Sequence, residues 1–302
     1  IALAVFLLST TCWEAAGAEP PAVDPALHTA NRAARDYAII IGNESYRALP
    51  HAPYALSDAA SFREYFRRTR GMSRYRSRQI SNRTARQIRS ELRRALYRVG
   101  RGGTIWLVFA GHGSSTPGGM DRAILGVDAI IEDVVDGAVD GGVPLTEVAD
   151  ILSNSTKADR IIVMVDAAFG GPTRDGLQLA EGETVPVPAT NTYKDERLTL
   201  WTAATGLSRA GAYKPVDHGL FSYLVLGALR GWADGEITGE RDGDITLAEA
   251  QHFVHWTGRQ LGRTIRPSME RREGPQAWVL DQGAHLESPP SGELIHALAL
   301  AD

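Results

Sequence analysis

Runs of apolar residues recur along the chain, and each is separated from the next by a longer stretch of mixed polarity. The clearest runs are Tyr37–Ile41, Thr104–Phe109, Ala123–Val127, Arg160–Val165 and Leu198–Ala203, and a shorter one lies at Ala277–Leu280. Their apolar residues are consecutive rather than alternating, which is typical of strands buried on both faces. The pattern therefore predicts central strands with other elements packed on either side.

The stretches between these runs have the spacing of amphipathic helices. Ser57 is predicted to cap one helix, and Thr84, with Gln87 three residues later, forms the capping box of a second. Two more helices are expected at Leu145–Leu152 and Gly219–Leu229. Alternating strands and helices predict an α/β fold, with a mostly parallel central sheet of about six strands flanked by helices.

The two ends of the chain differ from this pattern. Residues 1–8 form an apolar run too short to span a bilayer, and Ala16-Gly17-Ala18 resembles a cleavage signal. Residues 1–18 are therefore predicted to be a signal peptide with a truncated start. The protein is expected to be exported to the periplasm or the medium, without a membrane partner after cleavage. Lipidation at Cys12 is a weaker alternative, because the residues before it match a lipidation signal poorly.

Composition divides the rest of the chain into three parts. Residues 19–35 are rich in Pro and Ala and are predicted to be a linker, residues 36–281 a single domain, and residues 282–302 a weakly ordered tail. Within the domain, residues 171–196 are rich in Gly, Pro, Thr and Glu and predict a long mobile loop. Cys12 is the only cysteine, so a chain starting at Glu19 has no thiol and no disulfide.

The net charge and the distribution of arginines bear on whether the protein binds polyanions such as nucleic acids. The formal net charge of −4 argues against a general polyanion binder, although 14 of the arginines lie between Ser61 and Arg101. Most of these arginines fall on the outer faces of the first two predicted helices, where charged residues are usually solvated surface. No nucleic-acid partner is predicted. Anion or envelope binding through these helices remains a distant alternative.

Two motifs carry candidate chemistry, and each directly follows a predicted buried strand. They are Phe109-Ala110-Gly111-His112-Gly113 and Val165-Asp166-Ala167-Ala168. Histidine suits proton transfer near neutral pH, and ligand chemistry in parallel sheets gathers at the carboxyl ends of the strands. Alone, the first motif is more often a turn, and Asp166 is more often a helix cap.

Taken in this order, the two motifs resemble the caspase and metacaspase family, in which a strand ends in Gly-His-Gly and a later strand ends in Asp-x-Cys. Further segments match the family in order: Tyr37–Asn43 with Tyr46, Ala55–Ala59, Leu125–Asp128, Thr202–Ala204, Gly219–Ser222 and Asp242–Thr246. The resemblance covers about residues 36–280. It implies a caspase-like three-layer sandwich.

The resemblance also implies roles for individual residues. His112 matches the catalytic general base and acid, and the backbone N–H groups of Gly113 and position 168 match the oxyanion hole. Asp166 and Asp58 match carboxylates of the pocket for the residue before the scissile bond (P1). Two carboxylates favour Arg or Lys there, so the implied partner is a peptide or protein with a basic P1 residue.

The chain departs from the family at the decisive position. Ala168 stands where the family has its nucleophilic cysteine, and a methyl group cannot attack a carbonyl. The implied function is a cysteine-type endopeptidase that is inactive as written. The alternative is a natural pseudopeptidase that serves as a peptide-binding or regulatory interaction module.

No cofactor is predicted, and calcium is the alternative considered. Thr238–Glu249 has the length of a calcium loop with glycine at its sixth position, but Thr238 replaces the usual first aspartate. A turn before a helix is favoured there. Because some metacaspases respond to calcium at other carboxylates, Asp133, Asp136 and Asp140 are unspecific candidates.

Overall fold

The computed structural model describes residues 20–25, 27–116, 119–133, 138–177, 179, 193–206, 208–261, 265–271 and 279–282. The predicted signal peptide and nearly all of the predicted tail lie outside these residues, as do residues 181–192 of the predicted loop. In the described part of the chain, no helix is both long and apolar enough to cross a bilayer.

A six-stranded sheet forms the centre of the molecule, in the order β12-β8-β7-β3-β1-β2. Its strands are β1 (Tyr37–Gly42), β2 (Ser77–Ser81), β3 (Gly103–Ala110), β7 (Ala158–Asp166), β8 (Leu198–Thr202) and β12 (Ser268–Arg271). Every neighbouring pair is parallel except β12 with β8. The prediction of a mostly parallel sheet of about six strands is confirmed.

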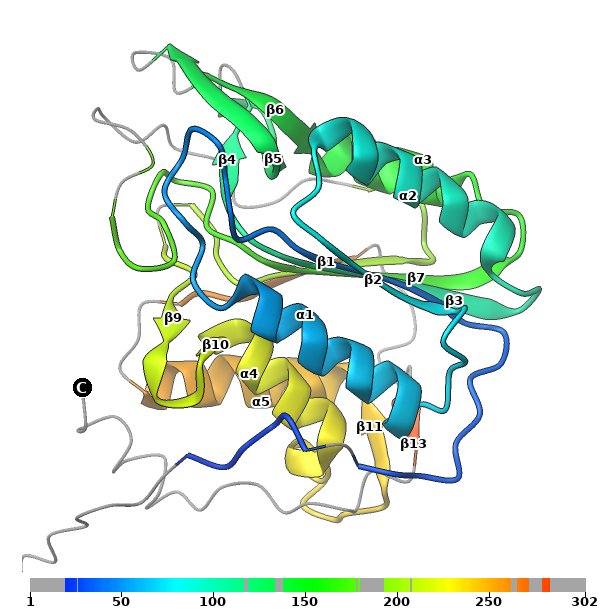
Figure 1. Cartoon of the computed structure of the whole chain (residues 1–302). Helices are drawn as coiled ribbons and strands as arrows, with labels where there is room; N and C mark the ends of the chain where they lie inside the picture. The colour runs from blue at the N-terminus through cyan, green and yellow to red at the C-terminus, as the bar shows by residue number, and fades with distance from the viewer. Residues whose placement is uncertain are drawn as a thin grey trace, which may run out of the picture.

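Helices cover both faces of this sheet (Figure 1). On one face lie α1 (Ala55–Glu64), α4 (Leu220–Gly227) and α5 (Leu247–Gln260), and on the other α2 (Ala85–Arg98) and α3 (Leu145–Ser153). Two π-helical turns, Tyr65–Thr69 and Ala228–Trp232, extend α1 and α4. Two apolar cores, one on each side of the sheet, follow from the consecutive apolar residues of its central strands.

Two of the strands predicted from the sequence do not belong to the central sheet. The apolar run Ala123–Val127 belongs to β5 (Arg122–Asp133), which pairs antiparallel with β4 (Gly113–Ser115) and β6 (Ala138–Pro144) in a separate sheet. The strand expected at Ala277–Leu280 is described as β13 (Val279–Gln282), which pairs with β11 (Asp244–Thr246) outside the central sheet. The edge strands β2 and β12 take their places.

Helix starts show one correct and one incorrect prediction. The capping box of α2 is confirmed, because Thr84 Oγ1 accepts from Gln87 N while Gln87 Oε1 accepts from Thr84 N. The cap predicted at Ser57 is wrong, since α1 begins at Ala55 after Tyr54, whose φ of 65° is left-handed. Ser57 therefore lies inside the first turn, and a side chain from elsewhere, Glu44, accepts the hydrogen bond from the N–H of Leu56.

The described residues of the predicted linker contain no helix or strand, and their backbone carbonyls bind side chains of α4 and its π-helical turn. Val23 is buried, and its carbonyl and that of Pro25 accept hydrogen bonds from the buried guanidinium of Arg230. The Tyr223 hydroxyl donates to the carbonyl of Pro21. These contacts hold the segment against α4 and its π-helical turn.

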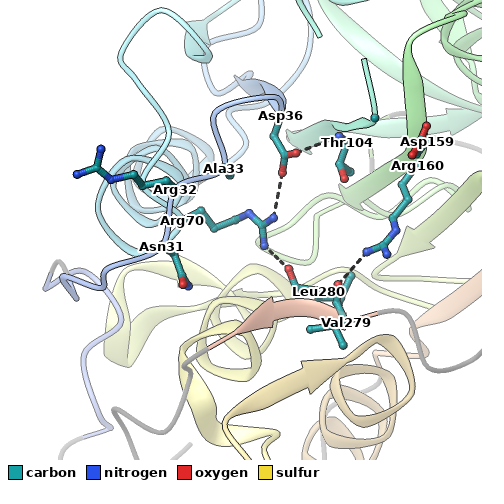
Figure 2. A pocket seen from close by; sticks show the side chains of 11 residues that line it. Asn31, Arg32, Ala33, Asp36, Arg70, Thr104, Asp159, Arg160, Val279 and Leu280 are labelled. Carbon is teal, nitrogen blue, oxygen red and sulfur yellow. Dashed lines mark hydrogen bonds and ion pairs between the residues drawn. The ribbon is translucent and has the colours of Figure 1, made fainter. Parts of the chain in front are cut away.

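Arginines also join elements at the amino ends of the central strands, around a cavity of about 390 Å³ (Figure 2). Arg70 Nη2 pairs with Asp36 Oδ2 at 2.9 Å and Nη1 donates to the carbonyl of Leu280, while Arg160 Nη1 donates to the carbonyl of Val279 at 3.0 Å. These bonds tie β13 to the sheet. The sequence motifs lie at the opposite, carboxyl ends of the strands.

Candidate functional site

The two sequence motifs meet because β3 and β7 are adjacent and in register. Ala110 at the end of β3 is the partner of Asp166 at the end of β7, so His112 and Ala168 each lie two residues beyond the last pair. A Cβ on Gly113 would lie 2.7 Å from the carbonyl oxygen of Ala168. The two loops are therefore in contact, and position 113 has room only for glycine.

His112 is buried and is fixed at both its backbone and its ring. Its N–H donates to the Tyr46 hydroxyl oxygen at 2.8 Å, and the two rings lie 4.7 Å apart. Ring atom Nε2 lies 2.9 Å from the carbonyl oxygen of Pro50. Burial lowers the pKa of His112 to about 4, so the imidazole is neutral near pH 7. Because Nε2–H donates to a carbonyl, Nδ1 carries the lone pair that can accept a proton.

The two predicted pocket carboxylates lie on different elements, Asp58 on α1 and Asp166 at the end of β7, and both bind the same guanidinium. Arg174 Nη2 pairs with Asp166 Oδ2 at 2.9 Å and with Asp58 Oδ2, while Nη1 donates to the carbonyl of Pro53 at 3.0 Å. All three charged side chains are at most 2% exposed. The sequence pattern did not single out Arg174, which lies near the start of the predicted 171–196 loop.

A second layer of donors holds these carboxylates in place. Ser222 donates to Asp166 Oδ2 through its N–H at 3.0 Å and through its hydroxyl at 2.7 Å. Asp58 Oδ1 accepts from Gly219 N at 3.0 Å and lies 2.8 Å from Nδ1 of His218. The segment Gly219–Ser222 was recognised in the sequence only as a family match. Its donors at the start of α4 are what orient the pocket.

Charges within this buried group balance. The two ring nitrogens of His218 face carboxylates of Asp58 and Asp24, so both carry hydrogen and the ring is an imidazolium. Burial by itself lowers the pKa of His218, but these two carboxylates outweigh it and raise the pKa. Burial, opposed by Arg174, raises the pKa of Asp166. Among the buried members, the carboxylates of Asp58 and Asp166 are thus matched by one guanidinium and one imidazolium, and Asp24 adds an exposed carboxylate beside His218.

Comparison with known proteins identifies the family to which the chain belongs. A family model described as the caspase domain matches residues 35–265, which is more than half of the chain. The chain belongs to the caspase-domain family. Among solved structures, the crystal structure of protein GSU0716 from Geobacter sulfurreducens is similar to this caspase domain, with a TM-score of 0.52 and 16% sequence identity. The match covers 84% of this chain and 100% of that one, and at this identity it supports the fold alone. No curated protein matches.

Family membership gives this caspase domain a peptidase-type function acting on peptides or proteins. Ala168, which the sequence resemblance predicts to stand at the position of the family's nucleophile, is buried and 4% exposed. Its methyl group has no lone pair with which to attack a carbonyl carbon. The arrangement holds the guanidinium of Arg174 between two carboxylates and leaves Nδ1 of His112 able to accept a proton.

Gly219 lets the caspase domain seat a guanidinium between the two carboxylates. A Cβ at this position would lie 1.7 Å from Arg174 Nη2 and 2.2 Å from Asp166 Oδ2. Those atoms are fixed by ion pairs, so the clash could not be relieved by a small side-chain shift. The absence of a side chain at position 219 is thus a requirement of the pocket.

The calcium candidates fall in three places. In the loop Thr238–Glu249, the last residue caps α5, because Glu249 Oε2 accepts from the N–H and hydroxyl of Thr246. Asp140 accepts from Gly141 N, whereas Asp136 and the side chain of Asp133 lie outside the described residues. Among the residues that the structure describes, no three or more His, Cys, Asp or Glu side chains are grouped to hold a metal ion.

Proposed function

We propose that this caspase domain binds peptides or proteins at an arginine or lysine side chain, which enters the pocket of Asp58 and Asp166. The observation that supports this most is the guanidinium of Arg174, which both carboxylates bind in a site closed from solvent. Ion pairs in such a site are strongly directional, and a guanidinium satisfies carboxylates at fixed angles. An acidic P1 residue would instead meet two like charges.

We propose further that the bound chain is not cleaved. His112 is neutral and has a proton-accepting Nδ1, so the general base is present, but Ala168 cannot serve as the nucleophile. A serine protease that loses its nucleophile retains roughly 10³–10⁴-fold acceleration over water from the remaining site, and we expect no more here. Spontaneous peptide hydrolysis is so slow that such a rate is undetectable in an ordinary assay.

Two functions are compatible with a site that binds a basic side chain and does not cleave the bound chain. The retained His112, Asp58 and Asp166 favour an endopeptidase for basic P1 residues in which only the nucleophile has been replaced. The occupation of the pocket by Arg174 favours the second candidate, a non-catalytic interaction module whose site is regulated by its own chain.

Restoring the thiol tests the proposal. Ala168→Cys would be assayed on fluorogenic peptides with Arg, Lys or Asp at P1, with and without calcium, both with Arg174 intact and with Arg174→Ala. Cleavage after Arg or Lys by either form, absent when His112→Ala is added, supports a peptidase site lacking only its nucleophile. If neither form cleaves but the unaltered chain binds Arg peptides over Asp peptides, the interaction module is correct. Equal cleavage, or equal binding, of peptides with Arg and with Asp at P1 would contradict the assignment of Asp58 and Asp166 to the P1 pocket.

A further inference from the structure

The segment that supplies Arg174 is a tight turn inserted into the site. Gly176 N donates to the carbonyl of Thr173 at 3.1 Å and Thr173 N donates to the carbonyl of Leu177 at 2.7 Å, so Arg174 and Asp175 form the tip. Gly176 has a φ of 87°, which an L-residue adopts only with strain. The sequence between Thr173 and Leu177 thus favours the presentation of two adjacent charged side chains.

The main chain of this tip is held by a hydrogen bond from the start of a strand. The carbonyl of Arg174 accepts from the N–H of Ala212 at 2.7 Å, at the start of β9 (Ala212–Tyr213). Peptide ligands commonly combine such a main-chain hydrogen bond with a side chain held in a specific pocket. Arg174 therefore has both contacts that the proposed function assigns to a bound peptide.

Beside the guanidinium lies a cavity of about 350 Å³, lined by Arg174, Asp175, Arg209 and Lys214 among other residues. Arg209 and Lys214 are exposed, and in the described part of the chain neither forms an ion pair with an acidic side chain. A Cβ on Gly176 would lie 3.5 Å from Arg209 Nη1, so this arginine reaches the turn itself. The residue after the arginine in the tip, Asp175, accepts a hydrogen bond from the Thr173 hydroxyl and lines the same cavity as these two cations.

We propose that Thr173–Leu177 is an internal stand-in for a peptide ligand, and that the ligand has an acidic residue directly after its arginine. This inference rests on the proposed function, because it uses the same Asp58–Asp166 pocket. The ligand's arginine displaces Arg174, and its acidic residue takes the place of Asp175 beside Arg209 and Lys214. The partner is therefore a protein or peptide carrying an exposed Arg-Asp or Arg-Glu pair.

Equilibrium binding to Arg174→Ala tests this, since the alanine at position 168 provides no nucleophile for turnover. The probes are agmatine and the capped dipeptides acetyl-Arg-Asp-amide, acetyl-Arg-Asn-amide and acetyl-Asp-Arg-amide, measured by calorimetry at low salt. We expect each to bind the variant more tightly than the unaltered chain. We expect Arg-Asp to bind about 3- to 10-fold more tightly than either of the other dipeptides, with the preference weakening as salt is added.

Variants that remove two positive charges, either beside the cavity or elsewhere, test which cations cause the preference for Arg-Asp over Arg-Asn. In the Arg174→Ala background, adding Arg209→Ala and Lys214→Ala should bring the Arg-Asp to Arg-Asn affinity ratio to about one, with each affinity normalised to agmatine on the same protein. Adding Arg86→Ala and Lys157→Ala changes the net charge equally at exposed positions elsewhere and should leave the ratio intact.

The outcomes separate this inference from the proposed function. Equal binding of Arg-Asp and Arg-Asn, or preference for Asp-Arg, would overturn the inference while agmatine binding still upholds the pocket. Failure of agmatine to bind a folded Arg174→Ala would overturn the pocket itself. If Arg174→Ala does not fold, Arg174→Lys keeps a cation in the cluster and should give the same ranking of dipeptides. A different ranking would count against the inference.

Discussion

Replacing Asp58 by asparagine perturbs the buried charges that define the site. Asp58 is fully buried and binds the Arg174 guanidinium, the His218 ring and the N–H of Gly219. Asparagine is nearly isosteric, but it removes the negative charge and leaves two buried cations with a single buried carboxylate, Asp166, because Asp24 is exposed. Breaking one side of a buried ion pair costs about 3–5 kcal/mol, and we expect Asp58→Asn to lower the free energy of unfolding by that amount.

Urea denaturation at neutral pH measures this change, and a surface pair supplies the control. Arg89 binds Glu147 through two hydrogen bonds of 2.7 Å, but both side chains are about a third exposed. Glu147→Gln should therefore cost at most about 1 kcal/mol. Adding Arg174→Met to Asp58→Asn removes the guanidinium that has lost one of its two carboxylates and should recover about 0.5–3 kcal/mol through the coupling between the two sites. Equal costs for Asp58→Asn and Glu147→Gln would refute the argument that burial makes this cluster matter.

Three further predictions concern pH and packing. The pKa of His218 is raised above 6.5, so the stabilisation from its charged ring should be complete below pH 6.5 and lost as the pH rises through the raised pKa. His218→Asn should remove this loss of stability at higher pH from a plot of unfolding free energy against pH. The pKa of His112 is lowered from 6.5 to about 4, so the free energy of unfolding should fall by about 3 kcal/mol as the pH is lowered from 6.5 to 4. His112→Asn should abolish that fall. Gly219→Ala should lower stability by about 1–3 kcal/mol in thermal denaturation, because its methyl group overlaps Arg174, whereas no loss would show that the pocket tolerates a side chain there.

The central strands could be predicted from sequence because they are buried on both faces. β1, β3 and β8 consist wholly of buried residues, and their apolar runs are visible without a structure. The edge strands could not be predicted in this way. β2 has a single large apolar residue, Ile80, and β12 has Met269, because an edge strand gives up much of its surface to solvent.

The candidate site divides along similar lines. His112 and Ala168 follow adjacent buried strands, so strand prediction and the rule for parallel sheets bring them together. Arg174 was missed because its partners depend on the path of a turn, and a Gly- and Pro-rich segment gives no periodicity from which to predict that path. His218 was missed because its burial follows from contacts with Asp24 and Asp58, far away in the sequence.

Covalent labelling tests most directly whether the pocket of Asp58 and Asp166 selects a guanidinium beside position 168. Ala168→Cys would be treated with a chloromethyl ketone of arginine or of aspartate, and the adduct located by peptide mapping, since Cys12 is the only other thiol in the chain. We expect the arginine reagent to label position 168, faster when Arg174→Ala is also present and slower when agmatine competes. Labelling by the aspartate reagent at the same rate, or no labelling of a folded protein by the arginine reagent even without Arg174, would contradict the assignment.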